Sequence, residues 1–305
     1  YSTRKMNAGL IRNRGVELSL GGMPVSTKNW KWEMNFNIAK NSNKLVELAD
    51  GVDSYSIYWT SFTTRLYNYA MVGKSLGVIT GNTWERDDNG NIIFHELSAS
   101  QKALYGGEYV PTYNQNTLDE LGNFHPDFTG GFNTSISFKN FRLSANIDFS
   151  VGGQIVSYTN MWGSSSGILD KTAELNDRGV NVREPVSKGG GIHMTGVDQN
   201  GNKVDTYVNA KLYYTTASRV WEEWVYDRTY VKLREVSLSY VFPSQTLKKL
   251  NIGLSRASVA INASNPWLIY SACPNVDVSE IGMGYFEGGN AAATRSIGFT
   301  VNLAF

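Results

Sequence analysis

The chain has 305 residues, a formal net charge of +1 and a sequence pI near 7.9, so its overall charge gives no argument for nucleic acid or an anionic surface as a partner. A single cysteine, Cys273, excludes an internal disulfide framework. No apolar run approaches the roughly 18 residues of a membrane-spanning helix, but this leaves membrane-spanning strands open, because each of those is only a weak alternating signal.

The first predicted strands cover residues 9–20 and 30–40. Apolar side chains alternate with polar ones in both, as expected where successive strand residues point to opposite faces. The apolar set is Val16, Leu18, Leu20, Trp30, Trp32, Met34, Phe36 and Ile38. Residues 21–29 contain two glycines and a proline, which predicts a short connection.

The clearest pattern lies in residues 131–151. Phe141 to Val151 alternates strictly over its whole length, which matches the roughly 9–11 residues that a tilted strand needs to cross a bilayer. The preceding stretch, 131–139, alternates as well, and Lys139-Asn140 predicts a tight reversal. We therefore expect a β-hairpin here.

Three further strands are predicted at 230–241, 252–262 and 294–305. In the first of them, Val231 and Leu233 are out of phase with Val236, which predicts a β-bulge or a part of the strand above the lipid. The last strand has a strongly apolar parity that ends on an aromatic residue. We predict that this parity faces lipid and forms the barrel-assembly signal: Ile297, Phe299, Val301, Leu303 and Phe305.

The connections between predicted strands are unequal. Those near 21–29, 139–140 and 243–251 are short, whereas 41–130, 152–229 and 264–293 are long and rich in Gly, Asn, Ser and Tyr. Membrane barrels have short periplasmic turns and long external loops. We therefore predict an all-β chain, an antiparallel transmembrane β-barrel portion of roughly seven to nine strands, with an even number of extra strands inside 41–130 and a periplasmic carboxy-terminus.

Aromatic residues in the long connections are candidate substrate contacts, because their rings can grip a sugar or a peptide. The candidates are Trp59, Trp84, Trp162, Tyr213 and Tyr214. The alternative is that these rings pack the loops or anchor them at the membrane interface. The sequence pattern does not separate the two interpretations.

No catalytic or metal-binding set is predicted, and no cofactor is expected. The three histidines lack ligand spacing, and no serine lies in a nucleophile motif, which argues against a hydrolase built on the barrel. Asp87–Asn91 and Asp198–Asn202 lack the later residues of a calcium loop and are predicted to be exposed Asn-Gly turns. The Glu222-Glu223 pair is expected on a solvated loop face.

Several segments, in order along the chain, resemble the SusC/RagA family of TonB-dependent transporters. Residues 7–18 read Asn-Ala-Gly-Leu-Ile-Arg-Asn-Arg-Gly-Val-Glu-Leu, and residues 125–132 read His-Pro-Asp-Phe-Thr-Gly-Gly-Phe. Residues 224–240 are similar to the family's "D-x-S-Y-V-K-L-R-E-[LV]-S-L-S-Y" segment. The chain departs from the family at Cys273-Pro-Asn-Val-Asp-Val-Ser-Glu280, where "D-P-E" is usual.

The resemblance implies that residues 1–305 are a carboxy-terminal β-barrel segment of a 22-stranded barrel, with the plug and TonB box absent from this chain. It implies the outer membrane of a Gram-negative, Bacteroidetes-type bacterium, with outer-membrane lipid around the barrel. It also implies TonB-dependent active import of a large nutrient, a glycan or peptide ligand.

Further partners implied by the resemblance are a SusD-like surface lipoprotein lid and the TonB complex, reached through the missing amino-terminal region. A dimer of transporter–lid pairs is one further assembly. No nucleic acid and no enzymatic activity are expected. The alternatives are a passive porin or adhesin barrel, and a soluble all-β carbohydrate-binding module.

Overall fold

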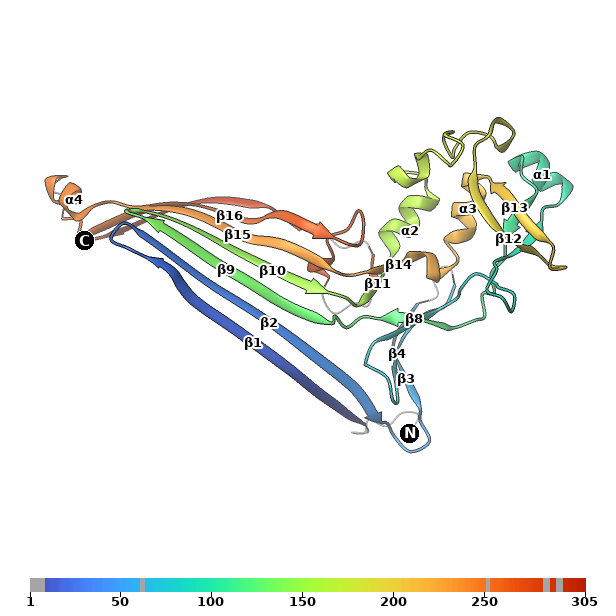
Figure 1. Cartoon of the computed structure of the whole chain (residues 1–305), viewed down its shortest axis with the longest axis horizontal. Coiled ribbons are helices and arrows are strands. Elements are labelled where there is room, and N and C mark those ends of the chain that lie inside the picture. The colour runs from blue at the N-terminus through green and yellow to red at the C-terminus, as the bar shows by residue number, and fades with distance from the viewer. Residues whose placement is uncertain (1–8, 61–63, 251–252, 282–285, 289–292) are drawn as a thin grey trace, which may run out of the picture.

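The computed structural model describes residues 9–60, 64–250, 253–281, 286–288 and 293–305. Its main feature is a long twisted sheet, which carries a compact body of short strands and helices at one end (Figure 1). We call this body the head. Asn7 and Ala8 of the family-like segment and the first residue of the predicted strand 252–262 lie outside the described residues.

The long sheet has seven strands in the order β1-β2-β9-β10-β15-β16-β18, and every neighbouring pair is antiparallel. The strands are β1 (Leu10–Ser26), β2 (Trp30–Glu47), β9 (Phe128–Phe138), β10 (Phe141–Val151), β15 (Tyr230–Val241), β16 (Arg256–Ser271) and β18 (Ser296–Ala304). All seven coincide with predicted strands. The predicted fold class is confirmed, and within the described residues 41–130 adds no further strand to this sheet.

Some strands are much longer than predicted. β1 has 17 residues, β2 has 18 and β16 has 16. β2 and β16 run past their predicted ends, 40 and 262, toward the head, and because a tilted strand crosses a bilayer in roughly 9–11 residues they continue beyond the lipid. Their extra length was hidden in the sequence because alternation of apolar residues stops where lipid no longer selects it. β1 instead gains its extra residues at the turn end, where 21–26 was predicted as part of a connection.

The phase break in β15 is a β-bulge. The pairing of β15 with β10 shifts between Asn146 and Ile147, and its pairing with β16 shifts between Leu233 and Glu235. Arg234 is the extra residue. This confirms the predicted irregularity, and it lets Val231 and Leu233 share the outward face with Val236 on the other side of the bulge.

The connections at the far end of the sheet are short, as predicted, with one difference. Lys139 takes a left-handed conformation, φ 51°, in the tight turn that joins β9 to β10. Residues 243–251, predicted as a short turn, instead contain a helix, α4 (Ser244–Leu250), which follows Pro243 directly. Proline fixes a helix-compatible φ and lacks the amide hydrogen that a first turn leaves unused.

The head is built from the three long connections. Its short strands form three sheets, in the orders β3-β4-β5-β8, β13-β12-β6-β7 and β14-β11-β17. These strands are β3 (Ser54–Thr60), β4 (Leu66–Met71), β5 (Val78–Gly81), β6 (Ile93–Glu96), β7 (Tyr109–Pro111), β8 (Asp119–Asn123), β11 (Gln154–Ser157), β12 (Ile192–Asp198), β13 (Lys203–Val208), β14 (Val225–Asp227) and β17 (Phe286–Glu287).

Short helices complete the head. They are α1 (Ala99–Tyr105), α2 (Tyr158–Ser165) and α3 (Ala210–Ala217), with 3-10 turns η1 (Asp170–Ala173), η2 (Val186–Lys188), η3 (Trp221–Trp224) and η4 (Val278–Glu280). None of them was predicted. Each spans at most about two turns, too few for a 3.6-residue period to emerge from the sequence.

The head has a hydrophobic core of its own, which corrects the expectation of extended loops. Trp221, Val220 and Met161 are 0% exposed and Trp224 is 1% exposed. They lie in one cluster with residues from β4, β5, β11 and α3. Segments that are far apart in the sequence supply this core, so no local pattern announced it.

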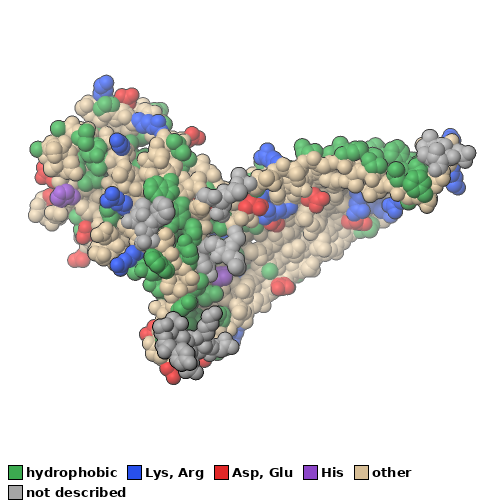
Figure 2. All heavy atoms as spheres, turned by 180° about the vertical axis from the view of Figure 1, so that it is seen from behind, with side chains coloured by type: hydrophobic (Ala, Val, Ile, Leu, Met, Phe, Trp, Pro, Cys, Tyr) green, Lys and Arg blue, Asp and Glu red, His purple; other side chains and the backbone are tan. Residues whose placement is uncertain are grey.

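The two faces of the long sheet differ in chemistry. The outward parity is apolar and exposed, reaching 82% at Ile297 and 67% at Phe299, whereas the inward parity carries Asn, Ser, Thr and charged residues. Figure 2 shows hydrophobic side chains along the outer margin of the sheet and charged ones within its hollow. Among the described residues, no helix is both long and apolar enough to cross a membrane.

Candidate ligand-binding site

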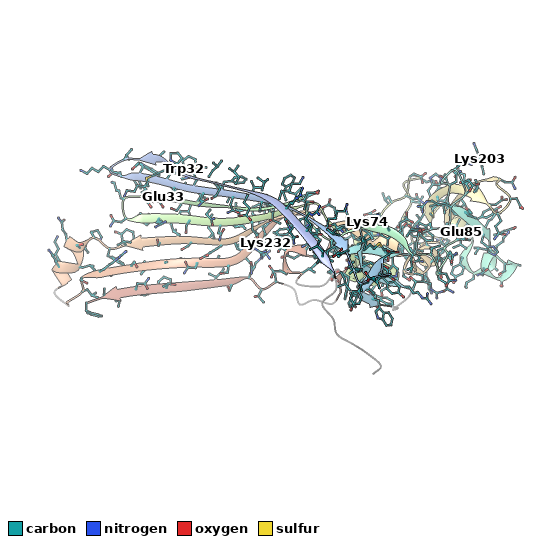
Figure 3. The ribbon with its side chains drawn as sticks, turned by 90° about the horizontal axis from the view of Figure 1, so that it is seen from below. Trp32, Glu33, Lys74, Glu85, Lys203 and Lys232 are labelled. Atoms are coloured by element: carbon teal, nitrogen blue, oxygen red, sulfur yellow. The ribbon has the colours of Figure 1, made fainter. Side chains whose placement is uncertain are left out.

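The inward face of the sheet contains a polar hollow of about 370 Å³ between β2, β9, β10 and β15. Arg142 Nη2 lies 3.4 Å from Glu33 Oε2 and donates a 3.1 Å hydrogen bond to Ser135 Oγ. Glu33 and Trp32 lie toward the turn end of the sheet, on opposite parities of β2 (Figure 3). Polar groups in this hollow can hydrogen-bond a polar ligand.

A charged cluster joins the sheet to the head. Lys232 on β15 is 1% exposed, and its ammonium lies 2.6 Å from both Asp277 Oδ2 and Glu280 Oε1. Arg234, the bulge residue, contacts Glu280 and lies 2.9 Å from Asp148 Oδ2. Figure 3 places Lys232 at the head side of the sheet. The bulge thus places a second cation beside the same carboxylate.

The carboxylates of Asp277, the N-cap of η4, and of Glu280 within η4 are held in their charged form. Burial, the largest influence on Asp277, raises its pKa, but the Lys232 ammonium and Ser279 together bring that pKa below its ordinary value. For Glu280 the hydrogen bond from Lys232 is the largest influence, and Arg234 adds to it, so the pKa is lowered. Both carboxylates therefore stay ionised at neutral pH, and their contacts with Lys232 hold η4 on β15.

A buried carboxylate, that of Glu287, holds β17 against α2. Glu287 is 3% exposed and accepts hydrogen bonds from Ser157 Oγ at 2.7 Å and from Thr159 Oγ1 at 2.5 Å. Ser157 is also the N-cap of α2, where its side chain accepts from the Asn160 amide. Glu287 therefore links the connection 264–293, which contains β17, to the connection 152–229, which contains α2.

These two carboxylate clusters border a hollow of about 340 Å³ at the base of the head. The charged residues that line it are Lys232, Asp277, Glu280, Glu287 and Arg295. Most of these charges already have protein partners. The hollow therefore presents an ordered set of donors and acceptors of both signs, which suits a polar ligand with several hydrogen-bonding groups.

An aromatic recess of about 490 Å³ adjoins this hollow, and Thr159 lines both. Phe286 stacks on Tyr58 with ring centroids 4.8 Å apart, and it meets Tyr158 edge-on at 5.1 Å. Trp162, 42% exposed, forms part of the wall. Burial raises the pKa of Tyr158 to about 12, so its hydroxyl remains protonated at any physiological pH.

The structure separates the predicted aromatic contacts. Trp162 lines the recess, and Trp59 is 59% exposed beside Tyr67. Trp84 and Tyr214 are only 2% and 7% exposed and belong to the head core, and Tyr213 is partly buried against Trp84. Trp84, Tyr213 and Tyr214 therefore pack the head, which was the alternative interpretation of these rings.

Three residues of the recess were not singled out from the sequence: Tyr58, Tyr158 and Phe286. Tyr58 and Tyr158 lie in connections with many other tyrosines, so nothing marked them. Phe286 reaches the recess because β17 pairs in parallel with β11, a contact over 130 residues. Only the tertiary structure brings these rings together.

The Glu222-Glu223 pair corrects another expectation. Glu222 Oε1 lies 2.8 Å from Arg86 Nη2, and Glu223 accepts hydrogen bonds from the Trp84 indole at 2.5 Å and from the Tyr213 hydroxyl at 3.2 Å. The pair therefore supports the head core instead of facing solvent freely. The two Asn-Gly segments are turns as predicted, with Gly90 and Gly201 at φ 83° and 81°.

Four of the predicted assembly residues lie on the outward face of β18, and Phe305 follows the strand directly. Their exposed fractions are 82% for Ile297, 67% for Phe299, 51% for Val301, 54% for Leu303 and 84% for Phe305. The carboxy-terminus lies at the turn end of the sheet, opposite the head (Figure 1). A role in assembly stays a prediction.

No protein-family model matches the chain. The chain is nevertheless similar to curated proteins. The chain is 27% identical over 284 residues to TonB-dependent receptor P3 of Formosa agariphila, covering 90% of this chain and 26% of that protein. It is 23% identical to TonB-dependent receptor P26 of the same organism, covering 100% of this chain and 30% of that protein. With TonB-dependent receptor SusC of Bacteroides thetaiotaomicron it shares 38% identity over 157 residues, 49% of this chain and 15% of that protein.

The fold is similar to solved structures of a RagAB peptide importer. One, in the closed-closed state, superimposes with a TM-score of 0.66 at 17% identity, covering 98% of this chain and 30% of that one. Another, titled as the RagAB peptide transporter, gives a TM-score of 0.61 at 16% identity, with 98% and 30% coverage. Our chain therefore spans about a quarter to a third of the length of the relatives that it matches along most of its sequence.

An antiparallel sheet with an apolar outward face, a polar inward face and a head at one end is a portion of an outer-membrane-type barrel. The relatives narrow this class: the predicted resemblance is confirmed, and the chain is SusC/RagA-like, corresponding to part of the barrel of such transporters.

Proposed function

We propose that the whole protein, of which these residues form part of the barrel, actively imports a large nutrient across the outer membrane with energy delivered through TonB. The observation that carries this proposal is the similarity to TonB-dependent receptors over 90% and 100% of the chain. The polar hollow and the aromatic recess at the base of the head support it, because they lie where a ligand entering from the head side would meet the barrel.

The substrate class in this proposal is an oligopeptide or a glycan. Donors and acceptors of both signs beside stacked aromatic rings can bind either. A SusD-like surface lipoprotein covers the head side as a lid, with a dimer of transporter–lid pairs as the larger assembly. A plug and a TonB-contacting segment lie outside the 305 residues. None of these roles requires catalysis.

The test uses the full-length protein in its own host. We expect uptake of its nutrient, followed with a labelled substrate, to stop when TonB is deleted. Continued uptake without TonB would instead support a passive porin. Purification through a tag on the transporter should bring down a lipoprotein, and mass spectrometry of the intact complex should identify the bound peptide or glycan. A complex that contains no lipoprotein would contradict the lid.

A further inference from the structure

The outward face of β1 and β2 changes character toward the head. Nearer the turn end of the sheet this face is apolar, with Leu18 paired to Ile38 and Leu20 paired to Phe36. Nearer the head it carries four exposed cationic side chains, which we call the basic patch: Arg12, Arg14, Lys40 and Lys44. They share the outward parity, because Arg12 pairs with Lys44, Arg14 with Ser42 and Lys40 with Val16.

A second observation, which does not depend on the apolar pattern, also indicates that this parity faces outward. Asn43 and Leu45, of the opposite parity on β2, are 8% and 2% exposed beneath the head. Asn43 Oδ1 accepts hydrogen bonds from Ser75 Oγ and the Leu76 amide, and Leu45 exchanges backbone hydrogen bonds with Lys74 and Gly73. Lys44, between them, must point away from the head.

No acid shares the outward parity of β1 and β2 with the basic patch. The three acids of the two strands, Glu17, Glu33 and Glu47, have the inward parity. None of the four cations forms an ion pair with a described acid. Arg12 stands directly opposite Lys44, and like charges in that position repel. An external anion would relieve this repulsion.

The height of the basic patch corresponds to the lipid headgroups. Trp30, packed on Phe138 with ring centroids 4.3 Å apart, marks the turn end of the apolar band. Ten residues separate Trp30 from Lys40, and at roughly 3.4 Å per residue and a tilt of about 40° they rise about 25 Å, the height of the apolar band of an outer-membrane barrel. Lys40 itself lies 5.0 Å from the centroid of the Phe128 ring, at the upper edge.

We propose that the basic patch binds the phosphate groups of the outer-leaflet glycolipid. This inference rests on the outer-membrane placement in the proposed function, but not on import. The occupant is a lipid headgroup and not a free anion, because the patch faces outward and continues the apolar band directly. The near-neutral total charge conceals the patch, since acids elsewhere in the chain cancel it in the sum. Two arginines supply planar forks that suit phosphate oxygens.

The experiment measures lipid binding to the purified full-length protein by native mass spectrometry. The probes are lipid A, lipid A from which the phosphates have been removed, and inorganic phosphate as a competitor. The test variants are K40Q/K44Q and R12Q/R14Q. The matched control is K248Q/K249Q, which removes two exposed cations from α4 at the opposite end of the sheet. Heat-dependent gel mobility verifies that each barrel has folded.

We expect wild type and K248Q/K249Q to bind lipid A equally, and each test variant to bind it about 30-fold more weakly. Removing the phosphates should weaken binding to wild type at least as much. Equal binding of phosphorylated and dephosphorylated lipid, or unchanged binding by both variants, overturns the proposal. Displacement of the lipid by millimolar inorganic phosphate overturns the lipid as occupant.

If a variant fails to fold, the two lipid forms compared on wild type still decide the question. The proposed import is tested separately. Uptake lost in a TonB deletion but retained in K40Q/K44Q leaves both proposals in place, whereas uptake that is independent of TonB affects only the import.

Discussion

The long sheet and the head of this chain are stabilised by different interactions. The sheet obtains its order from regular pairing between neighbours, and its outward residues remain up to 82% exposed in the isolated chain. The head instead buries large side chains such as Trp221 and Trp224 almost completely. The sheet therefore depends on lipid for its apolar face, whereas the head carries its own hydrophobic core. Substitutions should separate the two.

The largest effect is expected from Trp221→Ala. Its ring is 0% exposed at the centre of the head core, so the substitution should cost the head about 3–5 kcal/mol through lost burial and a cavity. Limited proteolysis should then cleave the head, while heat-dependent gel mobility shows that the barrel remains folded. Trp59→Ala, at a position 59% exposed, is the matched control. Simultaneous loss of both parts would show that they fold as one unit.

Lys232→Met should loosen the junction between the two regions. It leaves Asp277 without its cation and Glu280 with Arg234 alone, and breaking a fully buried pair costs about 3–5 kcal/mol. We expect the lower end of this range, because both carboxylates keep some contact with water. Hydrogen exchange of residues 277–281 should rise sharply. Exchange equal to that of Lys248→Met, an exposed control, would contradict the role of the cluster.

The same junction should weaken in acid. The pKa values of Asp277 and Glu280 are lowered in the folded protein, so their contribution to stability is complete above their ordinary pKa of about 4. It is lost as the pH falls through the lowered values. Exchange of residues 277–281 should therefore increase below about pH 4 in wild type. It should increase less in Lys232→Met, which has already lost the interaction.

Phe299→Arg addresses the sheet alone. Phe299 faces outward opposite Ile261, and a cation in mid-membrane costs about 2–4 kcal/mol. Thr300→Arg places the same charge one residue away on the inward face. We expect reduced outer-membrane yield only for Phe299→Arg. Equal yields of the two variants would contradict the assignment of the two faces.

Deletion of Phe305 tests assembly apart from stability. If the terminal aromatic is part of the recognition signal, the yield in the outer membrane should fall several-fold. Protein that does assemble should keep the unfolding temperature of wild type, because this 84% exposed ring makes few contacts. An unchanged yield would remove the proposed role.

The smallest effect is expected from Trp162→Ala in the aromatic recess. Loss of one ring contact should weaken ligand binding by about 0.5–1.5 kcal/mol, up to roughly tenfold in Kd, without unfolding the head. The amount of ligand that copurifies with the complex is the measurement. Leu175→Ala, at an exposed position outside the recess, is the control. Equal retention by both would place the ligand elsewhere.

The sequence predicted the sheet well because two environments select each strand position. Phe141 to Val151 alternates because lipid lies on one side and a polar interior on the other, so the sequence of one strand is enough to predict both environments. Even the bulge at Arg234 was visible, as a break in that alternation.

The head and its recess could not be predicted in this way. Trp84 and Trp162 looked equivalent in the sequence, yet one is buried at 2% exposure and the other is 42% exposed at the recess. The difference arises from contacts such as that between Trp84 and Glu223, 139 residues apart. No local pattern encodes such contacts, so composition identified the right kind of residue without identifying its role.

The sheet β14-β11-β17 carries a consequence for the order of folding. Its strands come from different parts of the chain, and β17 is supplied by the last connection before β18. Contacts over such separations form late because loop-closure entropy opposes them. Phe286 and Glu287 can therefore complete the recess and the hollow only after nearly the whole chain is in place. A partly assembled barrel would expose its surface to the medium without yet being able to hold a ligand.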